Sequence, residues 1–188
     1  MKTLGNLIGG LLFVGTIALS SCNPQPIPVR LPELPLSEVE PYFSEAAEVQ
    51  TIDTSYYQVK NADGKVLGTV LLSAPFSASV SGYNGPTPLL IALDADNRIT
   101  QVVMRDNQET PRFAQRVMDG GLYNSWNGLT VEEALAKDVD AVSGATYTSN
   151  GVKNSLKVRL EAYQRQLEKD YSALKPSLWQ RLFTPKRR

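Results

Sequence analysis

The chain has 188 residues, of which 42% are hydrophobic and 20% are charged, values typical of one globular domain with appendages. Nineteen basic residues balance 19 acidic ones, and a net charge of 0 disfavours a nucleic-acid-binding protein, which needs a basic excess. The absence of histidine excludes His-based triads, His metal sites and His-ligated haem. The single cysteine excludes internal disulfides, CxxC chemistry and Cys-ligated iron–sulfur clusters. Redox activity would therefore need an organic cofactor.

Residues 1–21 are predicted to form a lipoprotein signal peptide. A positive start, Met1-Lys2, precedes a mostly apolar stretch at 7–19. This stretch is shorter than the roughly 20 residues of a spanning helix and is typical of a signal core. Leu-Ser-Ser-Cys at 19–22 resembles a bacterial lipobox, which implies cleavage before Cys22 and a diacylglycerol on its sulfur. We expect a protein lipid-anchored to a membrane outside the bacterial cytoplasm, on the periplasmic face in a Gram-negative cell. An uncleaved anchor with an incidental cysteine is the alternative.

Residues 22–41 are predicted to form a proline-rich tether. Six prolines between residues 23 and 41 favour a semi-rigid polyproline II segment. For residues 31–36, packing along the surface of the domain is the alternative. The main domain is expected at 42–174.

Two β-hairpins are predicted in the first half of this domain. Strands at 56–59 and 66–72 flank an Asp-Gly turn, and strands at 89–93 and 99–104 form the second pair. A turn-rich loop, Gly-Tyr-Asn-Gly-Pro at 82–86, lies between the hairpins.

Three helices are predicted in the second half. They cover residues 113–118, a segment from the capping box at Thr130 to about Lys137, and the long stretch 149–174 with apolar residues every three or four positions. Strands followed by segregated helices indicate the α+β class, with antiparallel hairpins in a twisted sheet packed against helices.

The stretch at 140–149, Asp-Ala-Val-Ser-Gly-Ala-Thr-Tyr-Thr-Ser, lies immediately before the long helix. Free N–H groups and the positive dipole end of a helix N-terminus can bind phosphate, and small residues allow close approach to the backbone. An ordinary Ser/Thr cap preceded by a tight turn is the alternative.

Asp-Ala-Val-Ser-Gly-Ala-Thr at 140–146 resembles the flavinylation motif of the FMN-binding domain family, which includes the G subunit of the Rnf complex and the C subunit of the sodium-pumping NADH:quinone reductase. The resemblance implies that a flavin transferase joins FMN covalently, through its phosphate, to Thr146, and that Thr148 is the alternative acceptor. It also implies that the transferase reads Asp140, Ser143, Gly144, Ala145 and Thr146. The same resemblance places Ser143, Gly144 and Ala145 among the residues that bind FMN.

Two further stretches resemble this family. Gly-Tyr-Asn-Gly-Pro at 82–86 matches its Gly-Tyr-x-Gly-Pro stretch. Glu109-Thr110-Pro111 matches a segment that lies beside the flavin. Many members continue with Gly-Leu-Gly, whereas this chain has Arg112-Phe-Ala. Arg112 either stabilises a negatively charged reduced flavin or is a solvated surface residue.

The resemblance implies an electron-transfer flavoprotein that exchanges electrons with a membrane redox partner, more an electron carrier than a stand-alone enzyme. Thr146 would be an attachment point, no residue is assigned as a catalyst, and no metal is expected. Acid/base catalysis by Glu109 is disfavoured, because an exposed Glu is usually ionised. The alternatives are a non-redox lipoprotein and a small flavin-dependent reductase with its own substrate. The basic tail at 175–188, with interleaved apolar residues, is either an amphipathic surface segment or a simple terminus.

Overall fold

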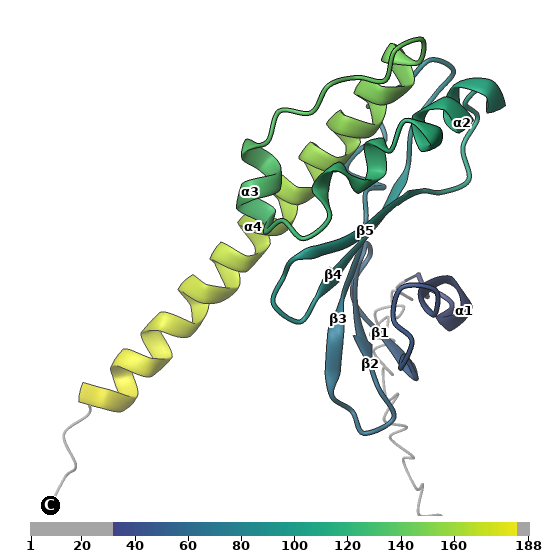
Figure 1. Ribbon diagram of the computed structural model, residues 1–188. Helices are drawn as coiled ribbons and strands as arrows, with labels where there is room; N and C mark the ends of the chain where they lie inside the picture. Colours follow the sequence, from purple (N-terminus) through teal and green to yellow (C-terminus); the bar gives the residue numbers. More distant parts are fainter. Residues whose placement is uncertain (1–31, 184–188) are drawn as a thin grey trace, which may run out of the picture. The chain divides into compact units, whose positions relative to one another are not determined.

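The structure, a computed structural model, describes residues 32–183 and their side chains up to Asp170 (Figure 1). The predicted signal peptide, the lipidation site at Cys22 and the tether up to residue 31 lie outside this part. The side chains of the 175–188 tail lie outside it as well. Within the described residues, no helix combines the length and apolar character needed to cross a membrane.

An antiparallel five-stranded sheet forms the centre of the domain, and its strands are ordered along the sheet as they are along the chain. Both predicted hairpins are confirmed: β2 (Tyr56–Lys60) pairs with β3 (Val66–Leu72), and β4 (Leu89–Asp94) pairs with β5 (Ile99–Met104). The first strand, β1 (Glu48–Asp53), is an edge strand that the sequence analysis did not predict. None of its residues is fully buried, and its two apolar residues, Val49 and Ile52, are three positions apart, so its sequence lacks the apolar alternation that marks a strand.

The helices come mostly after the sheet, which confirms the α+β class. At the start of α3 the predicted capping box is present, because the Thr130 hydroxyl accepts the Glu133 N–H at 3.2 Å and the Glu133 carboxylate accepts the Thr130 N–H at 2.8 Å. The long helix begins before residue 149, at Thr146, and continues to Phe183. The helices are α1 (Leu36–Val39), α2 (Pro111–Asp119), the 3₁₀ helix η1 (Leu122–Trp126), α3 (Val131–Ala136) and α4 (Thr146–Phe183).

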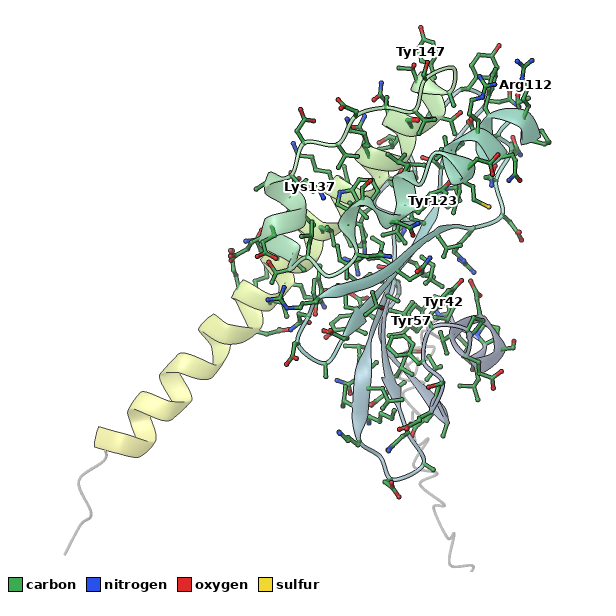
Figure 2. The ribbon with its side chains drawn as sticks, viewed as in Figure 1. Tyr42, Tyr57, Arg112, Tyr123, Lys137 and Tyr147 are labelled. Carbon is green, nitrogen blue, oxygen red and sulfur yellow. The ribbon has the colours of Figure 1, made fainter. Side chains whose placement is uncertain are left out.

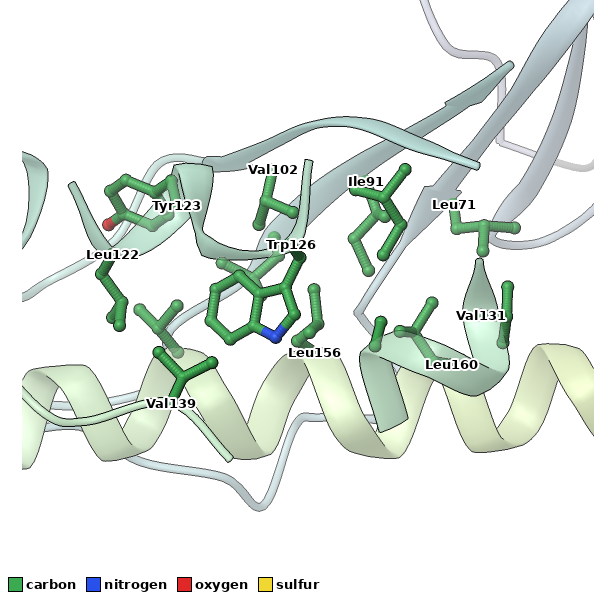
Figure 3. Close-up of a cluster of buried hydrophobic side chains, with 14 of the residues drawn as sticks. Leu71, Ile91, Val102, Leu122, Tyr123, Trp126, Val131, Val139, Leu156 and Leu160 are labelled. Carbon is green, nitrogen blue, oxygen red and sulfur yellow. The ribbon is translucent and has the colours of Figure 1, made fainter. Parts of the chain in front are cut away.

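The larger of two hydrophobic cores lies between one face of the sheet and the later helices (Figure 3). Alternate residues of β4, such as Leu89, Ile91 and Leu93, point into this core, as strand geometry requires. Trp126 of η1 and Leu156 of α4 pack against them. This packing holds the N-terminal half of α4 in place relative to the sheet.

The second core covers the opposite face of the sheet. Leu34, Val39 and Phe43 lie buried here, together with strand residues such as Tyr57 and Leu90. For residues 31–36 the sequence leaves a tether and a packed surface segment as alternatives; Leu34 and Leu36 of this segment pack in the second core. Packing of the domain therefore starts before residue 42.

Candidate functional site

The loop at 140–145, which we call the motif loop, leads directly into α4. Gly144 has a φ of +76°, a left-handed conformation that favours glycine. Ser149 fixes the loop from the first turn of the helix, because its hydroxyl accepts the Val142 N–H at 3.1 Å and donates to the Ala145 carbonyl at 2.9 Å. The two threonines that follow the loop are therefore held in defined positions.

These two threonines differ in accessibility. Thr146, the first residue of α4, is exposed, whereas Thr148 has only 1% of its surface exposed. The Thr148 hydroxyl also donates a hydrogen bond to the carboxylate of Glu109. An incoming reactant can reach the Thr146 oxygen, while the Thr148 oxygen is covered and already engaged.

Glu109 joins the three stretches that the sequence analysis singled out. Its side chain accepts the Asn84 N–H at 2.8 Å with one oxygen and the Thr148 hydroxyl with the other. The loop at 82–86, the start of α2 and the start of α4 therefore meet at a single carboxylate. Glu109 is only 5% exposed, so the assumption of an exposed glutamate was wrong. Its position indicates a structural role beside the site.

The same carboxylate affects Tyr123 in η1. Burial away from water, and secondarily the charge of Glu109, raises the pKa of Tyr123 to about 12. This phenol therefore stays protonated at neutral pH, and we assign it no proton-transfer role.

Two glycines let the 82–86 loop approach α4 closely. A Cβ on Gly82 would lie 2.7 Å from a carboxylate oxygen of Glu109. A Cβ on Gly151 would lie 2.7 Å from the Cα of Gly82, closer than side chains tolerate. The sequence analysis identified the first glycine through its motif but not the second, because nothing local to Gly151 indicates its neighbour.

Aromatic side chains surround a small cavity beside Thr146. The cavity has a volume of about 180 Å³ and is lined by Tyr83, Phe113 and residues 144–148. The ring of Tyr83 lies 4.8 Å from that of Phe113 and 6.4 Å from that of Tyr147, measured between centroids. Tyr83 and Tyr147 are 59% and 71% exposed, so this cluster offers ring surfaces to a ligand from solvent. The sequence analysis assigned no role to Phe113 or Tyr147.

Two arginines lie beside the motif loop. A second, open cavity of about 490 Å³ is lined by Arg112 and Arg116 of α2 and by Ser143 of the loop, among others. Figure 2 shows Arg112 and Tyr147 toward the same end of the domain, where α2 and the start of α4 lie. Arg112 is thus part of the site's surroundings, and Arg116 is a residue that the sequence analysis missed.

The remaining residues predicted at the site, Thr110, Pro111 and Asp140, do not line the cavity beside Thr146. Thr110 is the N-cap of α2 and Pro111 is its first residue, a position proline favours. Pro111 lines a separate groove, together with Met104 and Met118. These two residues start the helix that carries Phe113 and Arg116 to the site. Asp140 is exposed at the start of the motif loop.

The cavity beside Thr146 brings together an exposed hydroxyl, aromatic rings and a helix N-terminus, whose first N–H groups have no partner within the helix. The residues that line it include no carboxylate, lysine or cysteine. A reaction at the Thr146 oxygen would therefore need a base supplied from outside this cavity. The site is suited to holding a planar aromatic group with an attached anion.

Comparisons with known proteins agree with this geometry. Residues 82–161 match the FMN-binding domain family, and the match contains the 82–86 loop, Glu109 and the motif loop. The G subunit of the Na(+)-translocating ferredoxin:NAD(+) oxidoreductase complex of Acetobacterium woodii is 24% identical over 142 residues, which cover 70% of this chain and 66% of that protein. The G subunit of the ion-translocating oxidoreductase complex of Stutzerimonas stutzeri is 31% identical over 107 residues, 51% of this chain and 47% of that protein. The chain therefore spans less than two thirds of the length of either relative.

Among solved structures, NqrC of Shewanella oneidensis is similar, with a TM-score of 0.41 and 23% sequence identity. The similarity covers 61% of this chain and 60% of that one.

Proposed function

We propose that this chain, whose residues 82–161 match the FMN-binding domain family, carries FMN as a phosphoester of Thr146 and serves as an electron carrier outside the cytoplasm. FMN supplies the redox chemistry, because it exchanges one or two electrons. A covalent bond would prevent loss of the cofactor where the cell cannot replace it.

The observation that carries this proposal is the contrast between the two threonines. Thr146 offers an exposed hydroxyl at the start of α4, and Thr148 is buried against Glu109. Of the two acceptors that the motif allows, only Thr146 is open to an enzyme that brings the flavin.

The residues around Thr146 fit the two chemical parts of FMN. Tyr83, Phe113 and Tyr147 provide aromatic surface for the ring system. The N-terminus of α4 favours the phosphate.

Attachment requires an activated flavin and a separate enzyme. We propose a flavin transferase that uses an anhydride of FMN. The Thr146 oxygen bonds to the FMN phosphorus, the anhydride P–O bond breaks, and its electron pair leaves with the departing phosphate group. A base on the transferase takes the hydroxyl proton, since the cavity beside Thr146 supplies none. Asp140 and Ser143 are exposed next to the acceptor, where such an enzyme can read them.

The names of the relatives suggest the partner. Both are subunits of ion-translocating oxidoreductase complexes. We therefore propose that this chain passes electrons to or from a redox protein of the membrane. Lipidation at Cys22 would hold the domain at that membrane.

The test is export of the protein in cells that contain a flavin transferase, followed by denaturing electrophoresis and flavin fluorescence. We expect a fluorescent band for the wild type and for Thr148→Ser, which retains a hydroxyl, and none for Thr146→Ala. A colourless wild type would favour the non-redox lipoprotein. Turnover of a small substrate by the purified flavoprotein without a partner would favour the reductase.

A further inference from the structure

Helix α2 and the motif loop pack against each other through two glycines. A Cβ on Gly120, at the end of α2, would lie 2.8 Å from the methyl groups of Val142. One turn earlier on the same helix, the guanidinium of Arg116 lies where a Cβ of Gly144 would be. Gly120 of α2 thus leaves space for the side chain of Val142, and Gly144 of the loop leaves space for that of Arg116. As a result, Arg116 is held against the loop only two residues before the proposed acceptor.

The charge of Arg116 is not used inside the protein. Among the described residues, neither Arg116 nor Arg112 forms an ion pair or a side-chain hydrogen bond. The carboxylate of Asp119, which lines the same cavity, accepts a hydrogen bond from Gln115 at 2.8 Å. Two guanidinium groups and one carboxylate leave this cavity with an excess of one positive charge.

We propose that Arg116 binds the phosphate of the flavin, so that the site selects a phosphorylated flavin and holds its phosphoester after attachment. This inference rests on the proposed function. A guanidinium presents paired N–H donors that match the oxygens of a phosphate, and it remains charged at every physiological pH. A phosphodiester carries one negative charge, which the excess charge of the cavity balances.

The position of the loop supports a role at the phosphate rather than at the flavin ring. Ser143 lines the arginine cavity, whereas residues 144–148 line the aromatic cavity. The loop therefore borders a cationic cavity at Ser143 and an aromatic cavity from Gly144 onward, and Thr146 follows it directly. Arg112, one turn before Arg116, adds a second positive charge to the cationic cavity.

The test compares the rate of flavin attachment among variants of the full-length protein, using limiting transferase and mass spectrometry of the labelled fraction. Arg116→Gln removes the charge, and Arg116→Lys keeps the charge but loses the paired donors. Arg165→Gln is the matched control, because Arg165 is exposed on α4 and lies 19 residues from Thr146, roughly 28 Å along the helix. The ³¹P NMR shift of the attached phosphodiester, in native and denatured protein, provides a second measurement that does not depend on the transferase.

We expect Arg116→Gln to be labelled about tenfold more slowly than the wild type, the loss typical of one hydrogen bond to a charged group. Arg116→Lys should be intermediate and Arg165→Gln unchanged. The native ³¹P signal of Arg116→Gln should move toward its denatured position. Wild-type rates and an unchanged ³¹P signal in Arg116→Gln would overturn the inference while leaving the flavoprotein assignment intact. An unlabelled wild type would overturn the proposed function, and this inference with it.

Discussion

The Thr148 hydroxyl donates a hydrogen bond to the Glu109 carboxylate and so joins residues that are 39 positions apart in the chain. The same carboxylate accepts the backbone N–H of Asn84. A buried charge is stable only when such partners satisfy it. The contact therefore fixes the start of α4 relative to α2, and it leaves Thr146 as the threonine that faces solvent.

Replacing Thr148 by Val should lower the free energy of unfolding by about 1–3 kcal/mol, because the Glu109 carboxylate loses a partner inside the protein. Urea titration measures this loss. Thr148→Ser keeps a hydroxyl and should lose much less stability. Covalent flavin should persist in both variants. Loss of the flavin from Thr148→Val, with retention in Thr146→Ala, would instead place the attachment on Thr148.

Replacing Gly151 by Ala should destabilise the domain by about 1–3 kcal/mol, because the new methyl group overlaps the backbone of Gly82. The neighbouring exposed position provides the control, since Asn150→Ala adds no buried atom. Thermal unfolding of the two variants tests this contact. Equal melting temperatures would show that the 82–86 loop does not pack on α4 as described.

Replacing Tyr147 by Ala should increase the fluorescence of the attached flavin, because an aromatic ring stacked on the flavin quenches its emission. The side chain is 71% exposed, so the stability of the fold should not change. Met118→Ala is the control, since Met118 is 60% exposed on α2 and does not line the cavity beside Thr146. Equal emission from the wild type, Tyr147→Ala and Met118→Ala would mean that the flavin ring does not lie against Tyr147.

The phenol of Tyr123 should make the protein less stable at alkaline pH. Its pKa rises from 10.0 to about 12 on folding, mainly through burial. The folded state therefore holds this proton more tightly than the unfolded state. The resulting stability is complete below pH 10 and is lost as the pH rises toward 12, by about 2–3 kcal/mol.

Comparing the wild type with Tyr123→Phe isolates this effect from that of Tyr163, whose pKa is also raised by burial. Unfolding by urea between pH 9 and roughly 11.5 should show a steeper decline for the wild type than for the variant. Parallel declines would contradict a buried, protonated Tyr123.

Much of the fold follows from local sequence signals. The Asp-Gly turn and the β-branched strands beside it predicted β2 and β3, and Thr130 with Glu133 predicted the start of α3. The edge strand β1 and the four-residue α1 were missed. Val39 of α1 is buried against strand residues far along the chain, which no local pattern records. Strand β1 pairs with the adjacent β2, but none of its residues is fully buried.

The site, like the fold, combines features that local sequence predicts with features that only contacts between elements create. The resemblance of the motif at 140–146 to the FMN-binding domain family predicts Thr146 as the acceptor. Its choice over Thr148 is supported by burial, which depends on Glu109 from another element. Arg116 was missed for the same reason, since its approach to Gly144 exists only after α2 packs on the motif loop.

The measurement that tests the central claim most directly is peptide mass spectrometry of the protein after export with a flavin transferase. We expect a mass increase equal to FMN minus water on the peptide that contains residues 140–149, with fragment ions that place it on Thr146. An unmodified peptide from cells whose transferase labels a known acceptor would contradict the account. The motif loop would then be only a cap for α4.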